Sequence, residues 1–383
     1  MKTDPRHLAS AAAAFALPGT PVAFTPWGSG HINETWAATL EGGSARRAIL
    51  QRINTDVFRD PDALMANVTR VTRHLAAKLA GTADASRGAL TLIPARSGAD
   101  LYRDADGCVF RAYGFVEGAR SLDVLSSPRQ AYEAAKAFGT FQRLLSDLPP
   151  PRLAETIPHF HDTPQRLLRF REAVARDARN RAAGLAREIA FVEGRETLAR
   201  GLASLAADGR LAERVTHNDT KLNNVLLDDV TGEGVCVIDL DTVMPGLLLH
   251  DFGDMVRTAT NPVAEDEPDA SRVVASVPMF EALVRGYLEA MGSVLSPLER
   301  DHLVVSGMVL TYECGMRFLT DHLEGDVYFR IHRDGQNLDR ARTQFALVQS
   351  LEDREEELSR LVARVAAEVC PRETGEPRPL ITT

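Results

Sequence analysis

The spacing of hydrophobic positions changes part-way along the chain. The first part carries short runs rich in β-branched and aromatic residues, separated by glycines, which is typical of β-strands. We expect strands at 21–25, 34–40, 45–53, 89–93 and 108–114, with one helix at 61–79. Later hydrophobic residues recur at helical spacing, which predicts helices at 128–146, 164–205, 272–291, 297–322 and 338–367. The pattern predicts an α+β protein in which a small β-rich lobe, residues 1–116, precedes a larger, mainly helical lobe, residues 117–383.

Composition narrows the possible partners. The chain has 383 residues, 44% of them hydrophobic and 25% charged, so it can form a large core. Acidic residues outnumber basic ones by 53 to 44, and the formal net charge of −9 argues against a polynucleotide partner. No run approaches the roughly 18 apolar residues that a membrane-spanning helix needs. We therefore expect no nucleic-acid partner and no membrane association.

The cysteines indicate the cellular compartment. Cys108, Cys236, Cys314 and Cys370 are widely separated and form no C-x-x-C pair. This spacing predicts neither a disulfide framework nor a zinc site, and it favours reduced thiols. Near the amino terminus, Asp4 interrupts the basic end that a secretory signal would have. We expect a cytoplasmic protein.

A polar segment at 215–243 interrupts the helical part of the chain. It contains T-H-N-D-T-K-L-N-N-V-L-L and, after a turn, the apolar run V-C-V-I-D. A phosphoryl-transfer site needs a carboxylate that positions the attacking hydroxyl, and oxygen ligands for Mg²⁺. We expect Asp219 to be the catalytic base and Lys221 to face the transferred phosphate. Asn224 and Asp239 are expected to bind Mg²⁺, brought together by a hairpin.

Neighbouring polar residues are expected to support this segment. His217 is expected to brace backbone carbonyls. The tripeptide D-F-G at 251–253 spells a metal-binding motif of protein kinases, but Asp251 lies 32 residues after Asp219. Asp239 lies only 20 residues after Asp219 and directly follows a strand, as the metal ligand should. We therefore expect Asp251 and Asp254 to lie at the start of a helix that supports the loop.

The β-rich lobe carries a glycine-containing segment between its first two expected strands. Glycines there let backbone N–H groups approach phosphate oxygens. We expect this segment to bind nucleotide phosphates through Gly28, Ser29, Gly30 and His31. On the third expected strand, Gln51 stands where kinases carry a phosphate-binding lysine. Either Gln51 hydrogen-bonds the phosphates without a charge, or Arg52 supplies the charge from a shifted strand register. The stretch 110–118 has the texture of a linker whose backbone pairs with adenine.

With these motifs in place, nearly the whole chain resembles the aminoglycoside phosphotransferase and choline kinase family. The resemblance is carried by G-S-G-H-I-N, I-L-Q-R-I-N, H-N-D-T-K-L-N-N-V-L-L-D, V-C-V-I-D-L-D-T-V-M-P-G and E-C-G-M-R-F-L-T-D-H-L-E-G-D-V-Y-F. It implies a bilobal protein-kinase-like fold with ATP and Mg²⁺ as cofactors. Within the family, these segments are similar to those of kinases that phosphorylate the anomeric hydroxyl of N-acetylglucosamine or N-acetylgalactosamine. A sugar is thus the implied small-molecule substrate.

The resemblance also implies that Arg317 and Tyr328 contact the sugar, as Asp219 does. From the residues alone, Arg317 ends a small and apolar helical face, where it could instead pair with Glu313 or Asp321, each four residues away. Tyr328 could stack on a sugar ring or pack in the core.

Other functions stay open at this point. The acceptor could be an aminoglycoside, an amino alcohol or another monosaccharide. The alternative outside enzymes is a nucleotide-binding pseudokinase that acts as a scaffold, and the intact Asp219, Asn224 and Asp239 argue against it. The sequence gives neither the oligomeric state nor the preferred hexosamine epimer.

Overall fold

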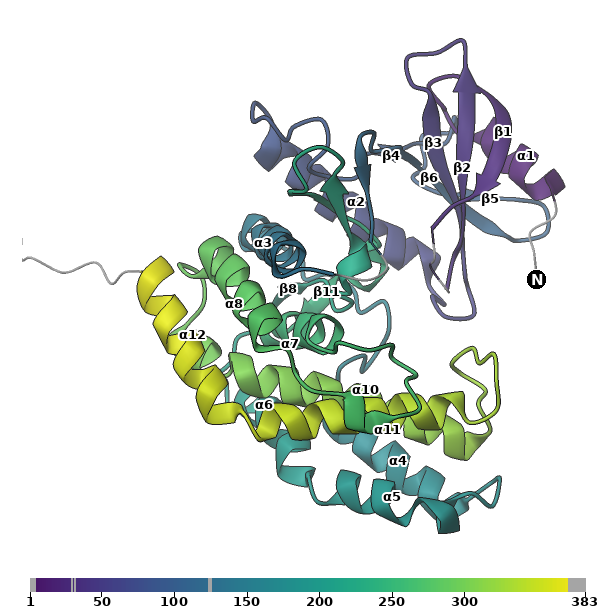
Figure 1. Cartoon of the computed structure of the whole chain (residues 1–383). Helices are drawn as coiled ribbons and strands as arrows, with labels where there is room; N and C mark the ends of the chain where they lie inside the picture. Colours follow the sequence, from purple (N-terminus) through teal and green to yellow (C-terminus); the bar gives the residue numbers. More distant parts are fainter. Residues whose placement is uncertain (1–4, 29, 31, 123–125, 371–383) are drawn as a thin grey trace, which may run out of the picture.

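The computed structural model describes residues 5–28, 30, 32–122 and 126–370. A twisted antiparallel sheet forms the amino-terminal part, at the upper right of Figure 1, and helices make up most of the remainder. The sheet has strand order β1-β2-β3-β6-β4, with β5 paired to β6. Its strands are β1 (Thr20–Pro26), β2 (Glu34–Glu41), β3 (Arg47–Ile53), β4 (Leu92–Ile93), β5 (Tyr102–Arg103) and β6 (Val109–Gly114). The predicted α+β class is confirmed, whereas the boundary between residues 116 and 117 stays a prediction.

Side chains of β3 alternate between two cores. Ala48 and Leu50 face α1 (Pro5–Ala14), whereas Ile49 and Ile53 belong to the larger core with α2 (Pro61–Leu79). Helix α2 begins where predicted, because the Asp60 side chain caps it and Pro61 occupies its first turn. Because successive side chains of a strand alternate, Gln51 lies on the α2 face of the sheet and Arg52 on the α1 face.

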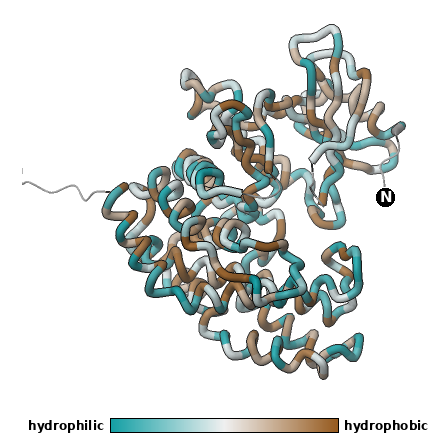
Figure 2. Tube along the Cα trace, viewed as in Figure 1, coloured by the Kyte–Doolittle hydropathy of each residue, from teal (hydrophilic) through white to brown (hydrophobic). Residues whose placement is uncertain are grey.

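The carboxyl-terminal part is built around the long, buried helix α10, which packs against α4, α7 and α11. Its helices are α3 (Pro128–Leu145), α4 (Thr163–Arg176), α5 (Ala186–Glu193), α6 (Glu196–Ala207), α7 (Leu248–Ala259), α8 (Val277–Met291), α9 (Pro297–Asp301), α10 (Leu303–Glu324), α11 (Gln336–Glu352) and α12 (Glu355–Val369). In Figure 2, hydrophobic and hydrophilic positions alternate along these helices, as expected when each buries one face. None of the described helices is both long and apolar enough to cross a bilayer.

Three of the predicted helical stretches are divided. The stretch 164–205 breaks after α4, where Asp177 adopts a left-handed conformation with φ of 37°, and again at Gly194, which ends α5. The stretch 297–322 divides at His302 into α9 and α10, and 338–367 divides after α11. Of the strand predicted at 89–93, only the last two residues form a strand, β4. These breaks depend on backbone conformations that hydrophobic spacing does not encode.

Five short strands in two small sheets hold the polar segment. Strand β8 (Arg214–Thr216) pairs with β11 (Met244–Gly246), and β9 (Val225–Asp228) pairs with both β10 (Gly234–Val237) and β7 (Ala119–Arg120). The loop between β8 and β9 and the turn after β10 therefore emerge close together.

Candidate active site

The loop between β8 and β9 carries the predicted base. Asn218 has a φ of 64°, a left-handed conformation that asparagine tolerates better than most residues. Its side-chain amide donates to the Thr242 carbonyl at 3.0 Å, which ties the loop to the segment after β10. The next residue, Asp219, keeps a side chain that is 21% exposed. The loop is thus rigidly held while its carboxylate stays accessible.

Asp219 lies among the other predicted loop residues. Lys221 Nζ is 3.0 Å from Asp219 Oδ1, and Asn224 Nδ2 donates to Asp219 Oδ2 at 3.2 Å. Burial alone would raise the pKa of Asp219, but the charge and hydrogen bond of Lys221 outweigh it and lower that pKa. Asp219 is therefore ionised at neutral pH and can accept a hydrogen bond from an attacking hydroxyl.

The hairpin brings Asp239 to the loop, as the sequence predicts. Ile238 N donates to the Asn224 carbonyl at 2.9 Å, and His217 Nε2 lies 2.9 Å from the Ile238 carbonyl. Asp239 follows with a φ of 59°. Burial and the like charges of Asp241 and Asp219 raise the pKa of Asp239 to about 6. Because Asp239 is solvent-exposed, we regard the like charges as the more important cause.

This donor set suits a hard divalent cation. The Asn224 amide nitrogen donates to the main-chain and side-chain oxygens of Asp219. Its Oδ1 accepts no hydrogen bond from the described residues and can therefore bind a metal ion. Asp239 adds a carboxylate close to the like charges of Asp241 and Asp219. Oxygen ligands and excess negative charge are what Mg²⁺ prefers.

His217 and Asp251 support the loop, in agreement with the sequence-based expectation. The buried Asp251 carboxylate, on α7, accepts hydrogen bonds from His217 N at 2.8 Å, Asn218 N at 2.7 Å and Gln142 Nε2 at 2.5 Å. Asp254, one turn later, pairs with Arg257 instead. With its oxygens engaged by the loop backbone, Asp251 holds the loop in shape.

The glycine-containing segment joins β1 to β2. Gly28 has a φ of 79°, and a Cβ added to Gly28 or Gly30 would meet nothing within 4 Å. The backbone at both glycines is therefore open to a ligand. Ser29 and His31 lie outside the described residues. Trp27, at the base of the segment, contacts Phe115 of the predicted linker edge-to-face at 5.2 Å between ring centroids.

Gln51 is hydrogen-bonded to a buried arginine, Arg111, that the sequence did not reveal. Gln51 Oε1 accepts hydrogen bonds from Arg111 Nε at 2.8 Å and Nη2 at 2.6 Å. Arg111, on β6, also forms an ion pair with Asp241 at 2.5 Å, and both side chains are almost fully buried. Arg52 lies on the opposite face of β3 near Glu34, and β3 pairs with β2 and β6 without a register shift. The shifted register is therefore wrong, and Arg111 supplies a cation on the Gln51 face.

Arg317 and Tyr328 line one groove. Arg317 forms no ion pair with Asp321, and Tyr328 does not pack in the core. Asp321 accepts backbone N–H groups of residues 327–329 at 2.8–2.9 Å, so it does not pair with Arg317. The Arg317 guanidinium instead lies 5.9 Å from the ring centroid of Tyr328, which is 60% exposed rather than in the core. Arg166 lines the same groove, where burial and the Arg317 charge lower its pKa. The groove therefore concentrates positive charge beside an exposed aromatic ring.

The comparison with known families decides the general class. Residues 23–292, well over half of the chain, match the phosphotransferase enzyme family. The chain belongs to that family. The phosphotransferase is also similar to solved small-molecule kinases. Choline kinase from Cryptosporidium parvum is 13% identical, with a TM-score of 0.59 over 94% of this chain and 99% of that one.

Two further structures show the same likeness. The microcompartment-associated aminopropanol kinase is 14% identical, with a TM-score of 0.57 over 93% of this chain and 99% of that one. Amicoumacin kinase, in complex with AMP-PNP and Ca²⁺, is 12% identical, with a TM-score of 0.56 over 96% of this chain and 94% of that one. The predicted protein-kinase-like fold is thereby confirmed.

The phosphotransferase contains another buried ion pair that the sequence did not reveal, between His161 and Glu313. His161 Nδ1 lies 2.9 Å from Glu313 Oε1, and His161 Nε2 lies 2.9 Å from the Asn218 carbonyl. Burial alone would lower the pKa of His161, but Glu313 and the carbonyl raise it, because both partners are acceptors. The pKa of Glu313 is lowered to about 2, since His161 and Thr163 outweigh its burial. Glu313 is thus engaged by His161 rather than by Arg317.

Proposed function

We propose that this phosphotransferase is an N-acetylhexosamine 1-kinase. It transfers the γ-phosphate of ATP to the anomeric hydroxyl of N-acetylglucosamine or N-acetylgalactosamine and releases the sugar 1-phosphate. The observation that carries the proposal is the groove that combines Arg317 with the exposed Tyr328. Phe160 connects this groove to the catalytic loop: its ring lies 5.7 Å from the Arg317 guanidinium, and the next residue, His161, contacts the Asn218 carbonyl.

The loop residues have separate roles. Asp219 orients the anomeric hydroxyl and takes its proton as the bond to phosphorus forms. Its low pKa suits this role, because in a loose transition state the proton leaves late and positioning matters more than basicity. Lys221 holds the Asp219 carboxylate and places a positive charge beside the transferred group.

Asn224 and Asp239 would hold Mg²⁺, which, when bound, neutralises phosphate charge. Gly28 and Gly30 offer open backbone to the phosphates. Strand β3 carries Gln51 where kinases usually have a lysine, and the buried Arg111 donates a hydrogen bond to the Gln51 side chain. The pairing of an ionised base with two oxygen ligands argues for an active kinase rather than a scaffold.

The charge of the groove favours a neutral acceptor over a cationic one. Arg166 and Arg317 face it without a carboxylate partner among the described residues, and Arg166 Nε is buried without a hydrogen bond. Asp321 is occupied by backbone N–H groups, and Glu324 by Arg169 and Arg176. A polycationic aminoglycoside or an amino alcohol would meet like charge here. A sugar offers hydroxyl and acetamido oxygens to guanidinium donors and a ring face to Tyr328.

ADP release over a panel of acceptors tests this proposal. We expect turnover with N-acetylglucosamine and N-acetylgalactosamine, and none with ethanolamine, choline or kanamycin. Arg317→Lys keeps the charge but loses the planar donors, so it should raise the KM for the sugar at unchanged KM for ATP. Arg169→Lys is the matched control, because Arg169 lies in the same groove but pairs with Glu324. Preference for an amino alcohol, or equal effects of the two substitutions, would reject the proposed acceptor.

A further inference from the structure

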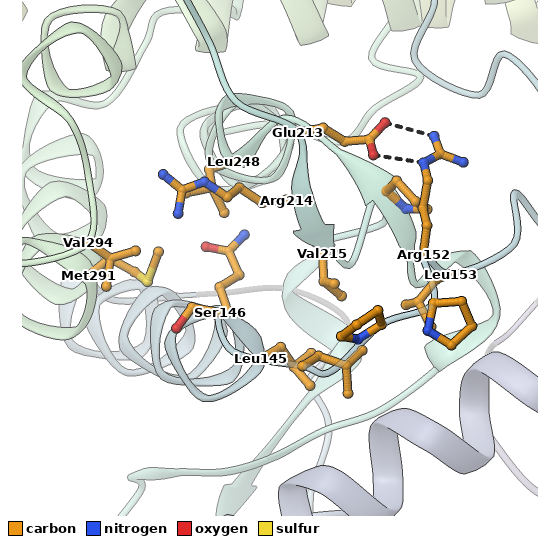
Figure 3. Close-up of a pocket in the computed structure, with 15 residues that line it drawn as sticks. Leu145, Ser146, Arg152, Leu153, Glu213, Arg214, Val215, Leu248, Met291 and Val294 are labelled. Carbon is orange, nitrogen blue, oxygen red and sulfur yellow. Dashed lines mark hydrogen bonds and ion pairs between the residues drawn. The ribbon is translucent and has the colours of Figure 1, made fainter.

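A cavity of about 290 Å³ lies behind the catalytic loop, and no residue assigned to phosphoryl transfer lines it (Figure 3). It is lined by the end of α3, the connector that follows α3, strand β8, the start of α7 and the end of α8, and it is open to solvent on one side. Its lining combines apolar and polar side chains in similar measure. The apolar ones include Leu145, Leu153, Val215, Leu248, Met291 and Val294, and the polar ones are Gln142, Ser146, Arg152, Glu213 and Arg214. The volume is close to the lower limit of about 300 Å³ for ligand pockets, so a small molecule fits.

One cation in this cavity lacks a counter-charge. The Arg214 side chain makes no hydrogen bond or ion pair with another described residue, and its Nε is buried. Its neighbour Glu213 is 2.7 Å from Arg152, and Figure 3 shows that pair pointing away from Arg214. The Arg214 guanidinium instead extends toward Met291 and Val294. Because its Nε is buried without a hydrogen-bond acceptor, an anion would supply the partner that this half-buried guanidinium lacks.

We propose that this cavity binds a small anion with an apolar body, such as a medium-chain carboxylate, whose charged group pairs with Arg214. The apolar side chains bury the body, and the guanidinium offers parallel N–H donors that match a carboxylate. Inorganic phosphate alone would leave the apolar side chains without a partner. A neutral molecule of the same shape would leave Arg214 unpaired.

The cavity is connected to the catalytic loop through hydrogen bonds. Gln142 lines it and donates to Asp251, which holds the His217 and Asn218 N–H groups. Leu248 lines it from the same helix as Asp251, and Val215 precedes the loop along β8. A ligand in contact with these side chains therefore changes kcat through the loop that carries Asp219.

Calorimetric titration with octanoate tests the binding. The wild-type protein should bind octanoate, and octanamide should bind at least about tenfold more weakly, since it lacks the charge that strengthens the hydrogen bonds. Arg214→Gln should weaken octanoate binding by a similar factor, whereas Arg152→Gln, at the rim, should not. Val294→Trp, which fills the cavity and keeps Arg214, should abolish binding. Circular dichroism confirms that each variant is folded.

Three outcomes would overturn the proposal: no binding of octanoate to the wild type, equal binding of octanamide, or unchanged binding to both Arg214→Gln and Val294→Trp. The titration needs no substrate, so it is independent of the proposed acceptor. The coupling is tested by kcat for N-acetylglucosamine at saturating octanoate. We expect a change of at least about twofold in the wild type and none in Arg214→Gln. Octanoate that binds without altering kcat would refute the connection through Gln142.

Discussion

Removing the buried cation Arg111 should destabilise the protein far more than removing an exposed one. The Arg111 and Asp241 side chains are 1% and 3% exposed. Arg111→Met therefore leaves a buried carboxylate whose one side-chain donor among the described residues is the Asn33 amide, at 2.5 Å. Gln51 also loses both donors to its side-chain oxygen. Breaking a buried pair in this way costs about 3–5 kcal/mol of unfolding free energy.

Urea denaturation followed by far-ultraviolet circular dichroism measures this loss. Arg103→Met is the matched control: Arg103 lies 2.6 Å from Asp62, but the two side chains are 44% and 69% exposed. An exposed pair contributes less than about 1 kcal/mol. Adding Asp241→Leu to Arg111→Met should recover stability, since it removes the uncompensated charge. Equal losses for Arg111→Met and Arg103→Met, or no recovery in the double variant, would refute the reasoning.

Three further predictions concern the loop and its supports. Asp219→Asn should lower kcat by about 100-fold to 10,000-fold, with ATP affinity nearly unchanged in a binding titration; near-normal turnover would reject the base assignment. Asp239→Ala should abolish Mg²⁺-dependent nucleotide binding, whereas Asp251→Ala should chiefly lower the melting temperature; the reverse pattern would make Asp251 the metal ligand. The stability that Glu313→Gln removes should be largest between the ordinary pKa values of the pair, 4.5 for Glu313 and 6.5 for His161. This loss of stability should shrink above the raised pKa of His161, and it should also shrink as the pH falls below 4.5 toward the lowered pKa of Glu313. Urea denaturation at a series of pH values measures it. A loss that is the same at every pH would show that the ion pair is absent.

The catalytic loop could be predicted because its information is local. Asp219, Lys221 and Asn224 lie within one short loop, and a hairpin of two brief strands is enough to return Asp239 to it. The D-F-G tripeptide lies within α7, as its position in the sequence predicts, whereas the assignment of Asp239 as the metal ligand stays a prediction. Helices α2 and α3, which each have a capping side chain and a proline at the start, also begin where predicted, whereas α8 begins at Val277 rather than at 272.

Arg111 and His161 could not be predicted, because their partners come from distant parts of the chain. Arg111 reaches Asp241 only once β6 lies beside β3 and the sheet packs on the helical part. His161 lies in a connecting segment, and Glu313 is on α10. Helical spacing brought Glu313 near Arg317, but spacing alone does not determine which cation a carboxylate selects.

The position of the transferred phosphate tests the central claim most directly. Phosphorus NMR of the product formed from ATP and N-acetylglucosamine should show a phosphate coupled to the anomeric proton, and the 1-O-methyl glycoside should not be phosphorylated, because it has no nucleophile to place beside Asp219. Phosphorylation of the methyl glycoside, or of another hydroxyl of the free sugar, would contradict the assignment of a sugar 1-kinase.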